Sequence, residues 1–363
     1  MSVKRMMLVC VLSLTSWMAQ AHEDNSTTFS TITPEAQTVE AIKSNRVHYL
    51  GSEVPAIDMH LHTGQFSTMG PLGQQFLIKT LNLPLPRWLV KSLLGWVSKF
   101  QLDPYGKYIG IQTECYRAGL SACVLFAVYP PETWGITSNE FVAGKLADTR
   151  NRNQTDTAPY FFGFASVNQT DWENQEAIQL SALRNALQQP NMIGIKLAFI
   201  HNGIPLNDRR FDSIYKVAAE LHVPVYHHLG SSPLRDLNSF TTEADKQRYI
   251  SSYDPAYLEG SIADNPDTTF ILGHMGFDFN NEGTNFTPKV FELASRYPNV
   301  YLEISAFGRK TYDPDGHVMD AILTEAKARG LLGRVLYGSD GPGNPGSTKE
   351  YLDHTLASME RVG

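Results

Sequence analysis

The stretch "AIDMHLHTG" at residues 56–64 places two histidines, one residue apart, at the end of an apolar run. Short apolar runs bounded by turn residues are typical of strands that are buried on both faces of a parallel sheet. Because side chains alternate across a strand, Asp58, His60 and His62 are expected to point into the protein together. Two buried imidazoles are costly unless something binds both, and a shared metal ion is the natural ligand.

Seven further apolar runs follow this one, and segments with helical periodicity separate them. These runs lie at residues 121–128, 160–167, 192–199, 223–230, 268–276, 299–305 and 333–340. Eight strands that alternate with helices predict an α/β fold, namely a (β/α)8 TIM barrel. An open doubly wound sheet is the alternative, but it usually has a glycine-rich phosphate loop after its first strand, and "HLHTGQFSTMG" is not such a loop.

Polar residues stand at the ends of three more predicted strands. His227 and His228 end the fifth strand, His274 ends the sixth and Asp340 ends the eighth. The carboxyl ends of all strands meet at one face of a barrel, and barrel enzymes carry their active sites at that face. The sequence therefore predicts a metal site at the C-terminal end of the strands.

Four motifs carry a resemblance to a known family. In chain order they are "DMHLH" (58–62), "VPVYHHLG" (223–230), "FILGHMG" (270–276) and "VLYGSDGPG" (335–343). Together they resemble the amidohydrolase superfamily, in particular the amidohydrolase-related branch that includes aminocarboxymuconate-semialdehyde decarboxylase. The resemblance extends over roughly residues 54–361.

The resemblance implies a role for each residue at these strand ends. It implies metal ligation by His60, His62, His228 and Asp340, and proton transfer by His274 and Asp340. Lys196 of "GIKL", His227 and Asp58 are candidates for a bridging or second-shell position, since a carboxylated lysine bridges two metals in binuclear relatives. Arg309, after the seventh strand, is a candidate for binding a substrate carboxylate. The cofactor implied is a divalent metal, with zinc as first choice and manganese as the alternative.

Three functions are compatible with such a site. The first is a metal-dependent hydrolase that acts on a small carbonyl compound (an amide, ester or lactone) through a metal-activated water. The alternative is a non-oxidative decarboxylase or hydratase of an unsaturated or aromatic carboxylic acid. The third is a metal-free barrel that only binds its ligand.

The chain is expected to divide into a leader, an extension and one domain. Residues 1–21 have a basic head, an apolar middle and "AQA" at the end, which predicts a signal peptide and a secreted or periplasmic protein. Residues 22–50 are expected to form an N-terminal extension and 51–363 the barrel. An insertion at about 65–101, rich in leucine and aromatic residues, is expected to form a lid, a wall of the site or a homodimer surface.

Charge and cysteine content limit the partners and the crosslinks. The formal net charge of −7 over 363 residues argues against nucleic acid and against anionic membranes as partners, which leaves a small-molecule substrate. Cys115 and Cys123 remain after leader cleavage, and two buried thiols are favoured over a disulfide.

Overall fold

The computed structural model describes residues 46–152, 158–305, 307, 309–310, 312–342 and 345–363. The expected signal peptide and residues 22–45 of the expected extension lie outside the described residues. Residues 46–54 contain a small antiparallel hairpin of β1 (Val47–Tyr49) and β2 (Ser52–Val54), which sequence analysis did not predict.

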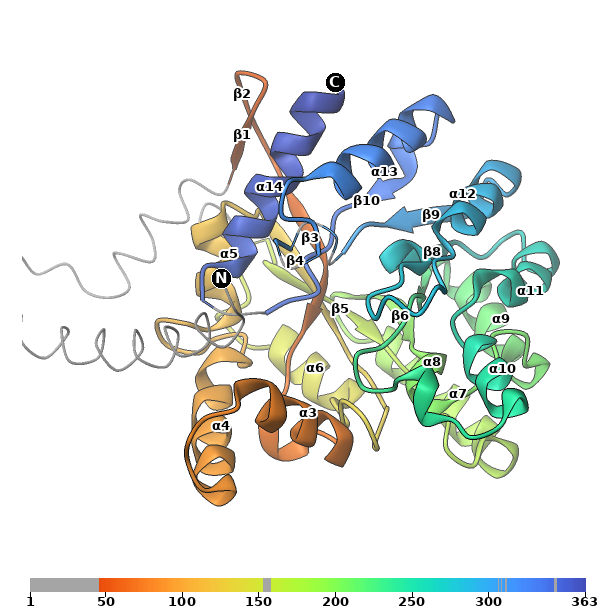
Figure 1. Cartoon of the computed structure of the whole chain (residues 1–363), viewed down its shortest axis with the longest axis horizontal. Coiled ribbons are helices and arrows are strands. Elements are labelled where there is room, and N and C mark those ends of the chain that lie inside the picture. Colours follow the sequence, from red (N-terminus) through yellow and green to blue (C-terminus); the bar gives the residue numbers. More distant parts are fainter. Residues whose placement is uncertain (1–45, 153–157, 306, 308, 311, 343–344) are drawn as a thin grey trace, which may run out of the picture.

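Eight parallel strands form the centre of the molecule (Figure 1). In chain order, which is also their order in the sheet, they are β3 (Ile57–His62), β4 (Ala122–Phe126), β5 (Phe161–Ala165), β6 (Met192–Leu197), β7 (Val225–His228), β8 (Phe270–Gly273), β9 (Val300–Glu303) and β10 (Val335–Leu336). The first strand also meets the segment that follows the last one: Met59 N donates to Tyr337 O (3.0 Å), and His62 N donates to Gly341 O (2.6 Å). These bonds close the ring, so the predicted (β/α)8 barrel is confirmed.

Helices alternate with the strands along the chain. They are α3 (Pro71–Leu81), α4 (Arg87–Gln101), α5 (Ile111–Ala118), α6 (Asn139–Leu146), α7 (Trp172–Leu187), α8 (Phe199–Asn202), α9 (Asp212–Leu221), α10 (Glu243–Ile250), α11 (Glu259–Asp264), α12 (Thr287–Arg296), α13 (His317–Ala328) and α14 (Ser347–Val362). Short 3₁₀ turns lie at η1 (Phe66–Thr68), η2 (Arg209–Phe211), η3 (Leu237–Ser239), η4 (Pro255–Leu258), η5 (His274–Gly276) and η6 (Leu332–Arg334). Among the described residues, no helix combines the length and the apolar character needed to span a bilayer.

Two apolar layers hold the barrel together. One fills its interior with residues from alternate strand positions, including Val124, Phe126, Phe164 and Tyr226. The other lies between strands and helices and contains the opposite strand positions with the inner helix faces. Cys115 and Cys123 belong to this outer layer, and both are buried free thiols, as expected.

The first strand departs from strict alternation. Its register against β4 shifts between Asp58 and Leu61, which marks a β-bulge. Met59 consequently packs against the interior cluster, although it was expected to face the helices. Asp58 pairs with Cys123 of the outer layer, so the expected inward orientation of Asp58 is wrong. The extra residue of the bulge turns the chain so that His60 and His62 still point inward.

Three other segments differ from expectation. The insertion, for which one or two short helices were expected, forms α3 and α4, and the segment after β7, expected as a long loop, contains α10. The last strand is only two residues long. After Leu336 the chain leaves β9 and pairs with β3 instead, where the carbonyls of Tyr337 and Gly341 accept from β3. Residues 338–340, between these two contacts, bulge away from β3.

Gly338 lies where this closing segment passes the site, and no side chain fits there. A Cβ at Gly338 would lie 1.9 Å from Oε1 of Glu303 and 2.8 Å from Cβ of His60. We expect Gly338→Ala to lower the free energy of unfolding by about 1–3 kcal/mol, the usual cost of overpacking. Denaturant unfolding measures this effect. Gly333→Ala is the control, because a Cβ at Gly333 meets nothing within 4 Å. Equal stability of the two variants would contradict the packing argument.

Candidate metal centre

Three donor atoms form a tight triangle at the carboxyl ends of the strands. Nε2 of His60 lies 3.0 Å from Nε2 of His62, and both nitrogens lie 3.3 Å from Oδ1 of Asp340. Donor atoms bound to one tetrahedral zinc ion are ~3.3–3.6 Å apart, which is close to these separations. His60 is fully buried and the His62 side chain is 38% exposed, so the triangle opens toward solvent on one side.

His274 brings a fourth donor to the same place. One donor atom each from His60, His274 and Asp340 lie within 4.8 Å of one another. The ring of His228 lies beside that of His274, with 4.3 Å between the centroids. Nε2 of His228 and Nε2 of His274 are both buried, and neither has a hydrogen-bond partner among the described residues. Unpaired buried nitrogens that converge on carboxylate and imidazole donors fit a bound divalent cation.

The buried carboxylate of Glu303 organises these imidazoles from behind. Its Oε2 accepts from the hydroxyls of Tyr226 and Ser305, both at 2.8 Å. The Tyr226 oxygen lies 2.9 Å from Nδ1 of His60, and the Ser305 oxygen lies 2.8 Å from Nδ1 of His274. Since each hydroxyl donates its proton to Glu303, each hydroxyl oxygen accepts from the imidazole. Both rings therefore carry their proton on Nδ1 and offer the Nε2 lone pair to the site.

Burial sets the charge states of the site. It lowers the pKa of His274 to about 3, against a smaller opposing effect of Asp340, so the ring is neutral at neutral pH. Burial raises the pKa of the Asp340 carboxyl, but His60 and His62 outweigh that effect and hold it well below its usual range. An ionised carboxylate beside neutral imidazoles is the donor set that divalent metals prefer.

Two of the site residues adopt strained backbone conformations. His274 has φ of +57° and Asp340 has φ of +53°, in the left-handed region that side chains other than glycine rarely adopt. Arg309 supports Asp340, because its Nη2 donates to the carbonyl oxygens of Asp340 (2.6 Å) and Ser339 (3.3 Å). Such strain persists only where the surroundings hold it, and it concentrates at functional sites.

Asp58 joins the two chain segments that carry the triangle. Its Oδ1 accepts from His60 N (2.9 Å) and from Ser339 N (3.0 Å). Burial raises the pKa of Asp58 to about 7. Asp58 therefore positions the ligand-bearing backbone from the outer layer of the barrel.

Lys196 lies below the site inside the barrel. Its ammonium nitrogen is 3.8 Å from the ring centroid of Tyr226 and has no hydrogen-bond partner among the described residues. Burial lowers the pKa of Lys196 to about 7, while Asp340 and Glu303 oppose this effect. An unpaired lysine at this depth is compatible with the bridging position considered for it.

His227 lies outside the centre, which corrects its candidacy for a bridging or second-shell position. Its Nε2 is 3.2 Å from the Tyr215 hydroxyl, and its ring contacts Phe199 and Phe270. These contacts place it in the layer between strands and helices. Consecutive strand residues face opposite ways, so only His228 of the pair points inward.

Several site residues escaped sequence analysis. Glu303 and Ser305 belong to the stretch "NVYLEIS", and an acidic residue inside an apolar run was the signal for them. His201 of α8 contacts His228, with 4.9 Å between ring centroids, and contacts Trp134 at 6.5 Å. Trp134 in turn contacts Phe76 of α3, so the insertion backs one wall of the site, as one of the expectations held.

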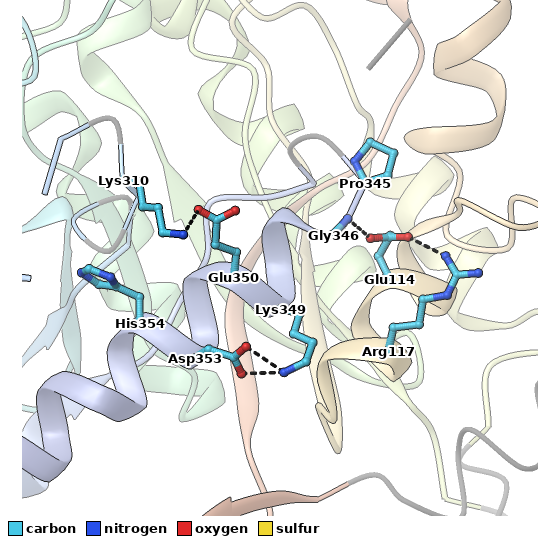
Figure 2. A pocket seen from close by; sticks show the side chains of 9 residues that line it. All are labelled: Glu114, Arg117, Lys310, Pro345, Gly346, Lys349, Glu350, Asp353 and His354. Atoms are coloured by element: carbon cyan, nitrogen blue, oxygen red, sulfur yellow. Dashed lines mark hydrogen bonds and ion pairs between the residues drawn. The ribbon is translucent and has the colours of Figure 1, made fainter. Parts of the chain in front are cut away.

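A cavity of 640 Å³ lies elsewhere, between α5 and α14 (Figure 2). None of the candidate metal ligands lines it. Its charged side chains are already paired with one another, as in Lys310–Glu350 (3.2 Å) and Lys349–Asp353 (2.7 Å). The strand ends therefore remain the better candidate for chemistry.

Comparison with known proteins supports this reading of the fold. A family model described as Amidohydrolase matches residues 129–361, a range that includes His228, His274 and Asp340. No curated protein matches the chain at a significant level.

Solved structures with the same fold have low sequence identity. An uncharacterised TIM-barrel protein from Bordetella bronchiseptica has 18% identity and a TM-score of 0.56, over 85% of this chain and 95% of that one. A probable 2-pyrone-4,6-dicarboxylic acid hydrolase from Acinetobacter baumannii has 14% identity and a TM-score of 0.53, over 85% and 92%. A 5-carboxyvanillate decarboxylase from Novosphingobium aromaticivorans, solved with manganese, has 13% identity and a TM-score of 0.49, over 84% and 90%.

The adjacent histidines of β7 provide a matched pair of variants. We expect His228→Asn to lose most of the bound metal, because its Nε2 faces the centre without another partner. His227→Asn should keep the metal in the folded protein, because its ring lies in the outer layer. Metal content per folded chain is measured by elemental analysis. Full occupancy in His228→Asn would remove this residue from the ligand set.

Proposed function

This chain belongs to the amidohydrolase family, and we propose that it is a metal-dependent hydrolase of a small carbonyl compound such as an amide, ester or lactone. The observation that carries the proposal is the pair of Nδ1-protonated rings, His60 and His274, whose Nε2 atoms converge with the Asp340 carboxylate. Structural metal sites are usually enclosed by four ligands. This centre is partly exposed at His62, which leaves access for a substrate.

Zinc is the proposed metal, held by His60, His62 and Asp340 with His228 as the further ligand. Nitrogen-rich sets with one carboxylate suit zinc, and manganese is the alternative to test. When bound, such a cation lowers the pKa of a coordinated water toward neutrality and polarises a carbonyl.

The residues of the chain supply the proton transfers. Neutral His274 accepts a proton at its unpaired Nε2. The charge that develops on its ring is stabilised through the Ser305 hydroxyl by the Glu303 carboxylate, which parallels the support of a catalytic histidine by a buried acid. Asp340, ionised beside two imidazoles, is the second proton acceptor at the site.

Decarboxylation of an unsaturated or aromatic acid is the second candidate, and two arginines favour it. Arg309 lies 3.7 Å from Oδ2 of Asp340, and its side chain is 38% exposed. Nε of Arg235, in the loop after β7, is buried without a partner among the described residues. Arg235 lies beside Gly203 at the end of α8, the helix that carries His201. A guanidinium group close to the site suits a substrate carboxylate. One solved structure with a similar fold is described as a probable 2-pyrone-4,6-dicarboxylic acid hydrolase. An anionic substrate is therefore compatible with both proposed reactions, hydrolysis and decarboxylation.

The expected signal peptide makes the proposed reaction extracytoplasmic.

A screen of lactones, esters, amides and unsaturated acids, each with zinc and with manganese, distinguishes the two functions. Hydrolysis products identify the first function, and release of carbon dioxide identifies the second. A purified protein that contains no metal would favour the third function, a metal-free barrel that only binds its ligand.

His274→Asn separates proton transfer from metal binding. We expect turnover to fall by roughly a hundredfold or more, the usual size of a proton-transfer contribution, with most of the metal retained. Steady-state kinetics and metal content are measured on the same preparation. His48→Asn is the control, since that side chain is 69% exposed and distant from the strand ends. A metal-free His274→Asn protein would make His274 a ligand.

Arg235→Met tests whether the substrate is a carboxylate. The variant should raise KM for an acid substrate by roughly tenfold, because a charged hydrogen bond is lost, and leave KM for the matching methyl ester unchanged. Parallel kinetics on the acid and the ester give the comparison. An equal change for both substrates would assign Arg235 to the structure of the loop instead.

A further inference from the structure

The insertion carries charge of the opposite sign to the rest of the chain. Residues 64–102 contain four basic side chains and no acidic one, whereas the whole chain has a formal charge of −7. The basic residues are Lys79, Arg87, Lys91 and Lys99. All four are exposed, and none forms an ion pair with another described residue. Figure 1 shows α3 and α4 together at one edge of the molecule.

The outer face of α4 and the turn before it is apolar. The exposed fraction is 68% for Trp88, 47% for Trp96, 43% for Leu85 and 36% for Leu89. These positions recur at helical spacing and therefore share one side of the helix. Val90 and Ser98 lie on the other side and are buried, so α4 is anchored to the fold by its inner face. Ser92, within the apolar stripe, donates its hydroxyl to the Trp88 carbonyl (3.0 Å).

We propose that this outer face of α4 docks on the surface of an anionic lipid bilayer. A helix that exposes tryptophan and leucine together with lysine and arginine resembles interfacial helices, which lie in the plane of the membrane. Indole rings favour the boundary between headgroups and acyl chains. The long stems of Arg87, Lys91 and Lys99 let their charges reach the lipid phosphates while the apolar stripe is buried.

Charge favours lipid over a second copy of the chain. A two-fold contact through this face would set the three cations of α4 against the same three cations of the partner, with no acidic residue in α4 to pair with them. Anionic headgroups supply the missing negative charge. The acidic remainder of the protein is repelled by the same headgroups, so the local charge also orients the molecule on the surface.

The docking surface is structurally connected to the metal centre. Leu72 N and Gly73 N of α3 donate to the carbonyls of Glu132 and Thr133, next to Trp134. Trp134 contacts His201, which contacts His228. The membrane-facing helices thus brace one wall of the site.

Binding to lipid vesicles tests the proposal with the full chain. The protein should cosediment with vesicles of phosphatidylcholine mixed with phosphatidylglycerol, and not with phosphatidylcholine alone. Binding should weaken as salt is raised, because exposed charges are screened. Trp88→Ser/Trp96→Ser should lower the partition coefficient at least about tenfold by removing exposed apolar area. Lys91→Glu/Lys99→Glu should lower it by a similar factor at low salt.

Matched controls locate the contact. Ile178→Gln removes another apolar side chain that is 60% exposed, and Lys216→Glu reverses the charge of another exposed lysine. Neither variant should change vesicle binding.

Brominated lipids should quench tryptophan fluorescence in Trp17→Ser, which alters the apolar N-terminal segment, but much less in Trp88→Ser/Trp96→Ser. Quenching lost only in Trp17→Ser would assign binding to the N-terminal segment and overturn the proposal. A second result would also overturn the proposal. In that case the protein would not bind anionic vesicles, and size-exclusion chromatography would show a dimer for the unchanged protein and a monomer for Trp88→Ser/Trp96→Ser.

Discussion

The site depends on one buried carboxylate. Glu303 has no exposed surface. Its Oε2 accepts from the hydroxyls of Tyr226 and Ser305 and from the backbone N–H of His274, and its Oε1 accepts from the backbone N–H of Ser305. A carboxylate in this position is costly unless its oxygens are satisfied, and those bonds satisfy them. The Tyr226 hydroxyl keeps the ring proton of His60 on Nδ1, and the Ser305 hydroxyl keeps that of His274 on Nδ1. His60 lies in β3, and His274 directly follows β8. Without this carboxylate, nothing described in the structure would keep both Nε2 atoms free of protons at the same time.

Sequence reasoning located the face of the barrel and the donors that end its strands. His60, His62, His274 and Asp340 converge because parallel strands of similar length bring their carboxyl ends together, and that geometry follows from the alternating pattern alone. The β-bulge in β3 was not predictable in this way, since the six residues of β3 alternate apolar and polar side chains without a break where the extra residue lies. It reversed the directions expected for Asp58 and Met59. Glu303 was also missed, because its role comes from contacts with β7 and β8, which lie far away in sequence.

The insertion contacts the neighbourhood of the metal centre on one side and displays an apolar face on the other. The side of α3 that faces the 130–137 loop supports a wall of the metal centre. The outer side of α4 displays tryptophan, leucine and unpaired cations. A helical pair with both properties connects the proposed docking surface to the candidate metal centre, whether the proposed substrate is neutral or acidic.

The hydrogen bond between Asp58 and Ser339 joins residues 281 positions apart and crosses the seam where the barrel closes. His60 and His62 lie on one side of this seam and Asp340 lies on the other. A cation held by all three acts as a clasp between the beginning and the end of the domain, so its binding energy becomes folding energy. The clasp cannot form during synthesis until the last strand has left the ribosome. With a cation bound there, the lifetime of the folded chain would depend on the supply of metal in its surroundings.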